Sequence, residues 1–435
     1  MALFHSPQVI TDNLILSYDV GNRKSYVGPP IQNRLTSISP MTTSGTGYSF
    51  VGGSEISDIP TVGPTLVQYS NIQNNYSAVS SWCCPNPFNY DGGGTVSVSG
   101  STLYTYAILY RIESGYTNGN YMYRYEYNSG GGYLTEGGVH SDGNRVHLGN
   151  GWYWAWGTFT TQPTAARLNV SSFYYRYSTS YDKLSVAKVL LVQGDYTSLH
   201  PRYWPDVNTT RSTAFVNQSN QTTTFTPSNM VYSNAGVPSF SESAGSTIVS
   251  NLPIGSTLPA LSSFTIEAWV KVTAWPTNTY TNGYGSNTKA GTIVGGCYYS
   301  GTGLRWGGSS SGNSMYVFGF VRGEDAYRNT PTYNVPALNV YNHFVFTNNS
   351  SAGGMNLYVN GVLYGTSSPA TQQYTPSLVS SCGNITINRA DIDGGGTSVY
   401  SYLNGNIDAV KVYTRALSTA EVVQNFNALR GRFGL

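Results

Sequence analysis

Carboxylate side chains are the groups that would carry hydrolytic chemistry in this chain, and their spacing argues against such chemistry. Retaining glycoside hydrolysis needs two carboxyl groups about 5–5.5 Å apart, and on a strand such a pair would stand at positions i and i+2 or i+4. Glu267 stands alone in its predicted strand, and Asp408 has no acidic neighbour. Gly-rich turns separate three further candidates, Glu113, Glu126 and Glu136. We therefore predict no catalytic residue, and we interpret these carboxylates as solvated or locally hydrogen-bonded.

A Gly-rich segment near the C-terminus is the candidate metal site. Asp391 and Asp393 precede three consecutive glycines, which predicts two carboxylates on one side of a loop. Ca²⁺ needs several oxygen ligands, so backbone carbonyls would have to complete the site. Two carboxylates alone are a weak site. We therefore favour a solvated turn over bound Ca²⁺, and we predict no other cofactor.

Aromatic side chains are the remaining chemical resource, since 14% of the residues are Phe, Trp or Tyr. Tyr298, Tyr299 and Trp306 surround Gly301 and Gly303, a pattern that predicts a Gly-rich loop. Loop aromatics can stack on a sugar ring or anchor a protein partner. The sequence does not distinguish these two roles, so the three residues are candidate glycan or partner contacts.

Two other aromatic runs are predicted to be strands that bury their rings. The three tryptophans within residues 152–156 alternate, so they point the same way, and we expect them to face a partner sheet. Within residues 121–127, four tyrosines share one face, while Arg124 and Glu126 share the other. Because a face with Arg and Glu is typical of the solvent side, we expect the Tyr face to point inward.

The elements that must position these residues are mostly strands. Alternating segments occur at 263–271, 343–347, 357–361 and 403–413, and Asn360-Gly361 is a dipeptide preferred by type I′ hairpin turns. The only good helix signal is at the C-terminus. Ser418 and Glu421 are spaced as a capping box there.

Three apolar residues of this predicted helix, Val422, Phe426 and Leu429, recur at helical spacing. Their stripe should pack against the sheet, and Arg430 with Gly431 should mark the end of the helix.

In this order, the C-terminal segments resemble the laminin-G-like, concanavalin A-like jelly-roll sandwich, in the version found in structural proteins of tailed bacteriophages. The most family-specific part is the run from Arg415 through the helix. The resemblance implies an all-β, antiparallel β-sandwich with one short C-terminal helix. It is a stronger indication of fold than of function.

The opening strand of this sandwich resembles residues 13–20, but its continuation comes only near residue 208. The intervening stretch predicts an inserted domain, because surface loops accept insertions. We assign residues 1–32 plus 204–435 to the sandwich and residues 33–203 to the insert. The strand beginning at Gly151-Trp152 and the segment 183–197 make the insert resemble a carbohydrate-binding-module-like jelly roll.

Composition excludes several classes of function. The net charge is +2, and no Lys/Arg run exists to grip nucleic acid. No stretch approaches the roughly 20 apolar residues that span a bilayer, and no signal peptide is visible, so we expect synthesis in a cytoplasm. Four cysteines are too few and too irregularly spaced for a disulfide framework or zinc site. We expect them to be reduced.

The resemblance implies a non-enzymatic structural protein on the exterior of a tailed-phage virion, made in the host bacterial cytoplasm. It would be a head decoration or fibre protein, or a tail or collar appendage. Its partners would be capsid, collar or tail proteins, with weak binding of host-surface polysaccharide. The alternatives are a receptor-binding, lectin-like adhesin and, disfavoured by its carboxylates, a glycan depolymerase. A homotrimer or attachment to a symmetric scaffold is typical of such proteins, and the sequence leaves the oligomeric state open.

Overall fold

The computed structural model of the protein describes residues 8–20, 32, 49–51, 67–72, 96–114, 121–139, 144–174, 182–199, 201, 204, 217–219, 223–233, 237–253, 263–277, 280–281, 287–296, 302–308, 314–322, 327–349, 354–368, 384–389 and 402–435. The expectation of reduced cysteines falls outside these residues, at Cys83, Cys84, Cys297 and Cys382. No helix in these ranges is long and apolar enough to cross a membrane.

Antiparallel sheets dominate the described residues, which include one α-helix, α3 (Thr419–Leu429). The predicted all-β sandwich with a short C-terminal helix is thus confirmed. The chain divides into two compact units. Unit 1 comprises Met1–Val27, Thr213–Ser233 and Val237–Leu435, and unit 2 comprises Gly28–Ser212 with Asn234–Gly236. The predicted insert, residues 33–203, falls within the longer segment of unit 2, and its independent folding stays a prediction.

Unit 1 contains two large sheets. The six-stranded sheet has the order β1 (Leu14–Asp19), β27 (Asn404–Tyr413), β16 (Ser263–Ala274), β23 (Tyr341–Asn349), β24 (Gly354–Val359), β25 (Val362–Ser367). The nine-stranded sheet has the order β12 (Phe225–Ser228), β15 (Thr247–Pro253), β26 (Asn384–Ile387), β18 (Asn287–Gly295), β19 (Thr302–Gly308), β20 (Met315–Arg322), β21 (Tyr327–Asn329), with β17 (Tyr280–Thr281) on β18 and β22 (Tyr333–Asn334) on β20. β13 (Val231–Tyr232) and β14 (Pro238–Ser239) pair separately.

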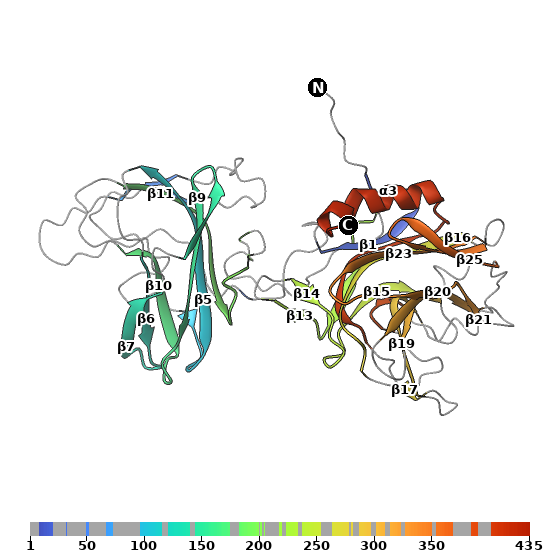
Figure 1. Ribbon diagram of the computed structural model, residues 1–435. Helices are drawn as coiled ribbons and strands as arrows, with labels where there is room; N and C mark the ends of the chain where they lie inside the picture. Colours follow the sequence, from blue (N-terminus) through green and yellow to red (C-terminus); the bar gives the residue numbers. More distant parts are fainter. Residues whose placement is uncertain are drawn as a thin grey trace, which may run out of the picture. The chain divides into compact units, whose positions relative to one another are not determined.

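Both faces of the six-stranded sheet are covered. On one face Phe264 packs edge-on against Phe346, with ring centroids 5.5 Å apart. A Cβ on Gly319 of the nine-stranded sheet would lie 2.2 Å from the Phe346 ring, so this face meets that sheet. On the other face Trp269 stacks on Phe433, with centroids 4.3 Å apart. Helix α3 lies over this second face (Figure 1), which explains why seven consecutive β16 residues are buried.

Helix α3 begins as the sequence predicts. Ser418 is the N-cap, and both hydrogen bonds of its capping box with Glu421 are present. Val422 is fully buried, and Phe426 with Leu429 packs against the cluster around Trp269. The helix ends at Leu429 and continues into a short 3₁₀ turn, η2 (Arg430–Arg432).

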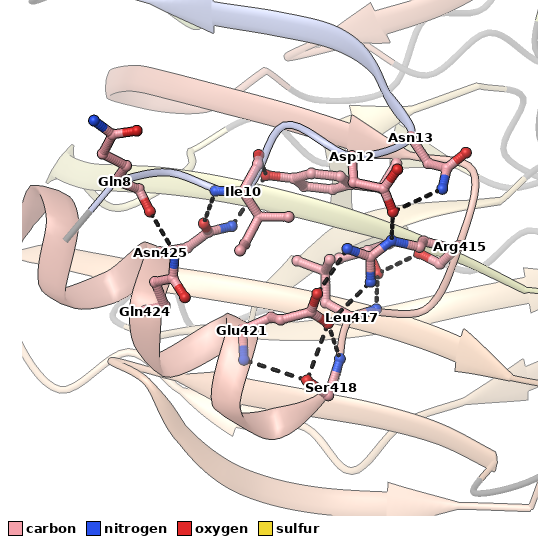
Figure 2. Close-up of polar contacts among 12 residues, drawn as sticks. Gln8, Ile10, Asp12, Asn13, Arg415, Leu417, Ser418, Glu421, Gln424 and Asn425 are labelled. Atoms are coloured by element: carbon pink, nitrogen blue, oxygen red, sulfur yellow. Dashed lines mark hydrogen bonds and ion pairs between the residues drawn. The ribbon is translucent and has the colours of Figure 1, made fainter.

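The N-terminal segment lies on this helix, as Figure 2 shows. The Ile10 N–H donates to Asn425 Oδ1 at 2.8 Å, and the Gln424 amide donates to the Gln8 carbonyl at 2.8 Å. Arg415 pairs with Asp12 at 3.0 Å. The segment then continues into β1, which pairs antiparallel with β27.

The chain returns from unit 2 beside the same strand. The Ser17 N–H donates to Asn217 Oδ1 at 2.7 Å, and the Ser219 hydroxyl donates to the Ile15 carbonyl at 2.7 Å. These side chains satisfy backbone groups of an edge strand that would otherwise be left to water. The two ends of the interruption therefore meet at one sheet edge.

Unit 2 also contains two sheets. The first has the order β2 (Ser49–Val51), β3 (Val67–Ile72), β11 (Asp182–Gln193), β5 (Leu103–Ser114), β9 (Trp152–Thr160), β8 (Arg145–Gly149). The second has the order β4 (Val96–Ser97), β10 (Arg167–Tyr174), β6 (Tyr121–Tyr127), β7 (Tyr133–Gly138). Arg124 of the second sheet lies 4.8 Å over the Phe159 ring of the first, so Phe159 marks the face of β9 that meets the second sheet.

The predicted orientation of residues 121–127 is wrong for the two charged residues. Glu126 is fully buried and accepts hydrogen bonds from Arg124 Nε at 2.7 Å and from the Gln162 N–H at 2.6 Å. Tyr125 and Tyr127 are half-buried. Because the ion pair satisfies the carboxylate, Glu126 can enter the interior despite its charge.

The tryptophans of β9 are buried in a different way from the one predicted. Trp152 and Trp154 are buried, and Trp156 is half-buried. They alternate with Phe159 and so point away from the second sheet. Trp204 packs edge-on against Trp154 at 6.3 Å and covers this outer face. The prediction that the three tryptophans face the partner sheet is therefore wrong.

Candidate functional site

The structure describes one of the predicted contact residues. Tyr298 and Tyr299 lie outside the described residues, as do the two calcium candidates Asp391 and Asp393. Within the described ranges, no group of three His, Cys, Asp or Glu residues could hold a metal ion.

Trp306 does not lie in a loop, and that prediction is wrong. It belongs to strand β19 and is fully buried. Its cross-strand partner is Val317, and the neighbouring pair, Leu304 with Gly319, lies on the same face. Since Gly319 meets Phe346 of the other sheet, Trp306 points into the sandwich core. Gly307 does not break the strand, because the Tyr316 ring occupies the space where its side chain would stand.

The opposite face of β19 and β20 presents a different set of aromatic residues. Tyr316 and Phe318 alternate with the inward-facing Val317 and Gly319, so they point away from the core. Their ring centroids lie 6.0 Å apart with an interplanar angle of 32°. Both side chains are half-buried. Sequence reasoning missed them, although the alternation along residues 315–321 is the signal that could have found them.

A positive charge lies beside these rings. The Arg305 Cζ atom lies 3.6 Å from the centroid of the Phe320 ring, and Arg305 pairs across the strands with Phe318. Arg305 is buried, as is Phe320. A cation over an aromatic face is favourable by about 2 kcal/mol when desolvated. This packing holds Arg305 in the interior next to the two half-buried rings, which are the part of this face that a ligand with an apolar face could contact.

A second group of polar residues lies under helix α3. We call Glu267, Lys411, His343 and Asn425 the buried polar cluster. Lys411 Nζ lies 2.7 Å from Glu267 Oε1, Asn425 Nδ2 lies 2.7 Å from Glu267 Oε2, and His343 Nε2 lies 3.2 Å from Glu267 Oε1. All four residues are buried. Of the two predicted environments, Glu267 is therefore hydrogen-bonded rather than solvated, and its partners come from other strands and from α3.

Burial and the neighbouring polar groups together shift the pKa values of Glu267 and His343. Burial raises the pKa of Glu267, but Lys411 and His343 outweigh it and hold this pKa below its ordinary value. Burial lowers the pKa of His343 more than Glu267 raises it. The cluster contains one carboxylate, whereas retaining glycoside hydrolysis needs two.

Asp408 is buried too, and of the two predicted environments it is hydrogen-bonded rather than solvated. Burial raises its pKa despite the hydrogen bond from the Tyr341 hydroxyl and the nearby Arg432. The same Arg432 pairs with Asp19 at 2.6 Å. Asp408 thus links β27 to β23 and to the turn after α3.

Comparison with known proteins bears on unit 1. Residues 244–423 match the family described as the concanavalin A-like lectin/glucanases superfamily. The predicted resemblance to the concanavalin A-like sandwich is confirmed over these residues. No curated protein matches the chain.

Several solved structures are similar to part of this chain. A heptameric SAP-like pentraxin from Limulus polyphemus is 19% identical, with 38% of this chain and 70% of that chain covered and a TM-score of 0.28. The binding domain of botulinum neurotoxin DC is 15% identical, with 49% and 48% covered and a TM-score of 0.33. The Ruminococcus gnavus IT-sialidase CBM40 is 17% identical, with 38% and 82% covered and a TM-score of 0.28. Similarity at this level transfers no ligand or activity to this chain.

Proposed function

We propose that this protein is a non-enzymatic, lectin-like binding protein whose unit 1 binds glycan on the outer face of its nine-stranded sheet. The observation that carries the proposal is the pair of half-buried rings, Tyr316 and Phe318, on the face of the sheet that points away from the core. Aromatic rings stack on the apolar face of a sugar, and the buried Arg305 supports the strands beneath them. The match to a lectin-containing superfamily supports the same function.

The expected binding is weak for a single site. Each stacked ring contributes about 0.5–1.5 kcal/mol beyond the burial of its area. Several copies acting together on one polysaccharide would raise the overall affinity without any new contact. This fits a protein repeated on a large particle.

We further propose that the particle is a tailed-phage virion, with the protein on its exterior as a head decoration, fibre, tail or collar component. Capsid, collar or tail proteins would be its partners, and it would be made in the host bacterial cytoplasm. The support is the sequence resemblance that runs from Arg415 through α3. Labelling the protein in purified particles, and counting its copies, would separate decoration of the head from a receptor-binding adhesin at the tail tip.

The binding proposal is tested with purified protein and host-surface polysaccharide. Replacing both Tyr316 and Phe318 by Ala should weaken binding about tenfold or more, as measured by calorimetry. Tyr364→Ala is the matched control, because that exposed ring lies on edge strand β25 of the other sheet. Equal affinities of the double variant and wild type would refute the proposed site.

The same incubation separates binding from hydrolysis. The polysaccharide should keep its chain length, as followed by size-exclusion chromatography. Progressive shortening that disappears on replacing one Asp or Glu would favour the depolymerase alternative.

A further inference from the structure

We propose that Lys411 and Asn425 are the reactants of a self-catalysed intramolecular amide bond, with Glu267 as the proton carrier. The product would be a covalent link between strand β27 and helix α3. This inference does not depend on the proposed glycan binding.

The three side chains come from three elements and converge on one carboxylate. Glu267 and Lys411 are directly opposite each other on the neighbouring strands β16 and β27. Lys411 Nζ lies 2.7 Å from one oxygen of Glu267, and Asn425 Nδ2 lies 2.7 Å from the other. One carboxylate thus holds the nucleophile and the leaving group at the same time, which is the geometry that a proton carrier between them requires.

Hydrogen bonds hold the amide group of Asn425 in one orientation. Its oxygen accepts a hydrogen bond from the Ile10 N–H at 2.8 Å, seen in Figure 2, and its nitrogen donates to the Tyr413 hydroxyl at 3.0 Å. A backbone N–H that faces the carbonyl oxygen can stabilise the negative charge that develops there during attack. The N-terminal segment therefore supplies the donor of a small oxyanion site.

The surroundings exclude water and hold the groups close together. Glu267 and Asn425 are fully buried, and Lys411 is 3% exposed. Tyr413, Val345 and Val422 form a buried apolar cluster on the same side of the sheet. Holding reactants in one place can replace a large part of the entropy that a bimolecular reaction loses.

The chemistry balances without an oxidant or a cofactor. The lowered pKa of Glu267 makes the ionised pair the resting form, so the reaction starts from the minor form in which Lys411 has passed a proton to Glu267. The neutral amine then attacks Cγ of Asn425. The C–N bond forms, and the carbonyl oxygen carries the negative charge opposite Ile10. Glu267 gives its proton to the departing Nδ2 and takes the second proton of the attacking nitrogen. The bond from Cγ to Nδ2 breaks, one ammonia leaves, and no electrons are gained or lost.

The bond would hold helix α3 and the N-terminal segment against the six-stranded sheet. Helix α3 carries Phe426 against Trp269, and the N-terminal segment rests on the same helix. A covalent link at Asn425 would keep both in place when other contacts open. Such a link suits a particle that must survive outside a cell.

The test is the intact mass of the purified full chain. After incubation in folded form at neutral pH, the mass should be lower than the sequence mass by one ammonia. Proteolysis and tandem mass spectrometry should then find a peptide pair joined at Lys411 and Asn425. In denaturant, Lys411 should fail to react with an amine-modifying reagent. A full sequence mass after prolonged incubation would overturn the proposal.

Variants separate the amide bond from other losses of ammonia. Glu267→Gln should retain the full mass because it lacks the proton carrier, and Lys411→Arg should retain it because it lacks the amine. Cyclisation at the Asn360-Gly361 turn also releases ammonia, but it joins no two peptides and persists in both variants. Ammonia loss mapped there alone would refute the proposal. If a variant does not fold, the presence or absence of the cross-linked peptide in the wild type still decides whether the amide bond forms.

Discussion

Each unit fully buries a glutamate that pairs with a basic residue, and the two basic residues differ in exposure. Glu126 in unit 2 pairs with Arg124, whose side chain keeps 16% of its surface exposed. Glu267 in unit 1 pairs with Lys411, which keeps 4%, and helix α3 closes the site. The first pair therefore retains access to water through its base. The second depends entirely on the protein for its hydrogen bonds.

This difference indicates which of the two buried ion pairs is more costly to break. A charge that loses its partner in a dry interior cannot be rescued by water. An arginine reaching the surface can keep part of its hydration, and its planar head also stacks on Phe159. We expect the loss of stability on breaking each ion pair to be larger where the basic side chain is less exposed.

The largest effect is expected for Lys411→Met. Removing the ammonium leaves the Glu267 carboxylate buried beside His343 and Asn425. Relative to wild-type protein whose intact mass shows that the amide bond has not formed, this should lower the free energy of unfolding of unit 1 by about 3–5 kcal/mol. Arg124→Met should lower that of unit 2 by about 1–2 kcal/mol. Urea unfolding followed by near-ultraviolet circular dichroism measures both. Equal losses of stability in the two variants would show that exposure of the basic residue does not determine the cost.

The charge-neutral double variant, Glu267→Gln with Lys411→Met, is the control for this prediction. Removing both charges leaves no unpaired ion, so part of the lost stability should return. If the double variant is as unstable as Lys411→Met, packing rather than charge explains the loss.

The second prediction concerns the helix that closes the site. Phe426 is half-buried and stacks on Trp269 with centroids 5.7 Å apart. A fully buried ring would be worth about 3–5 kcal/mol, so Phe426→Ala should cost roughly half of that, about 2 kcal/mol. Val423→Ala, on the exposed side of the same helix, should change stability by less than about 0.5 kcal/mol. Identical melting of the Phe426 variant and wild type would show that α3 does not hold the sheet.

The sequence predicts the regular parts of this molecule well and its interior charges poorly. Alternation and the Ser418 capping box predicted β16 and α3, because local periodicity and capping depend on residues close in the chain. The burial of Glu267 depends on Lys411 and Asn425, which lie more than a hundred positions away. No local pattern contains that information.

The candidate site was missed for a related reason. Gly301 and Gly303 suggested a loop around Trp306, whereas Gly303 and Gly307 belong to a strand in which neighbouring groups fill the space beside them. Which face of a strand meets the core depends on the partner sheet, so Trp306 and Tyr316 could not be assigned to inside and outside from composition alone. The same ambiguity reversed the direction predicted for the tryptophans of β9.

The third prediction concerns pH. The pKa of His343 is lowered in the folded protein, so the unfolded chain binds a proton first as the pH falls. Stability should therefore be full above pH of about 6.5 and decline below it, by at most about 1.4 kcal/mol per pH unit for one proton. The lowered pKa of Glu267 adds a further loss below its ordinary pKa.

Melting unit 1 between pH 7.5 and 5.5 measures this dependence. His343→Gln should flatten the decline, and His147→Gln, at an exposed position of unit 2, should leave it unchanged. A decline that survives His343→Gln would assign it to other groups.

The smallest effect is expected for Arg415, which extends the comparison to a base near the surface. Its side chain is 25% exposed and pairs with Glu421 at 2.7 Å and with Asp12 at 3.0 Å. Because water can replace both partners, Arg415→Ala should cost only about 0.5–1 kcal/mol. Hydrogen exchange should locate the change in residues 8–13, since Asp12 fastens that segment beside α3 (Figure 2). A loss as large as that of Lys411→Met would show that exposure of the base does not govern these ion pairs.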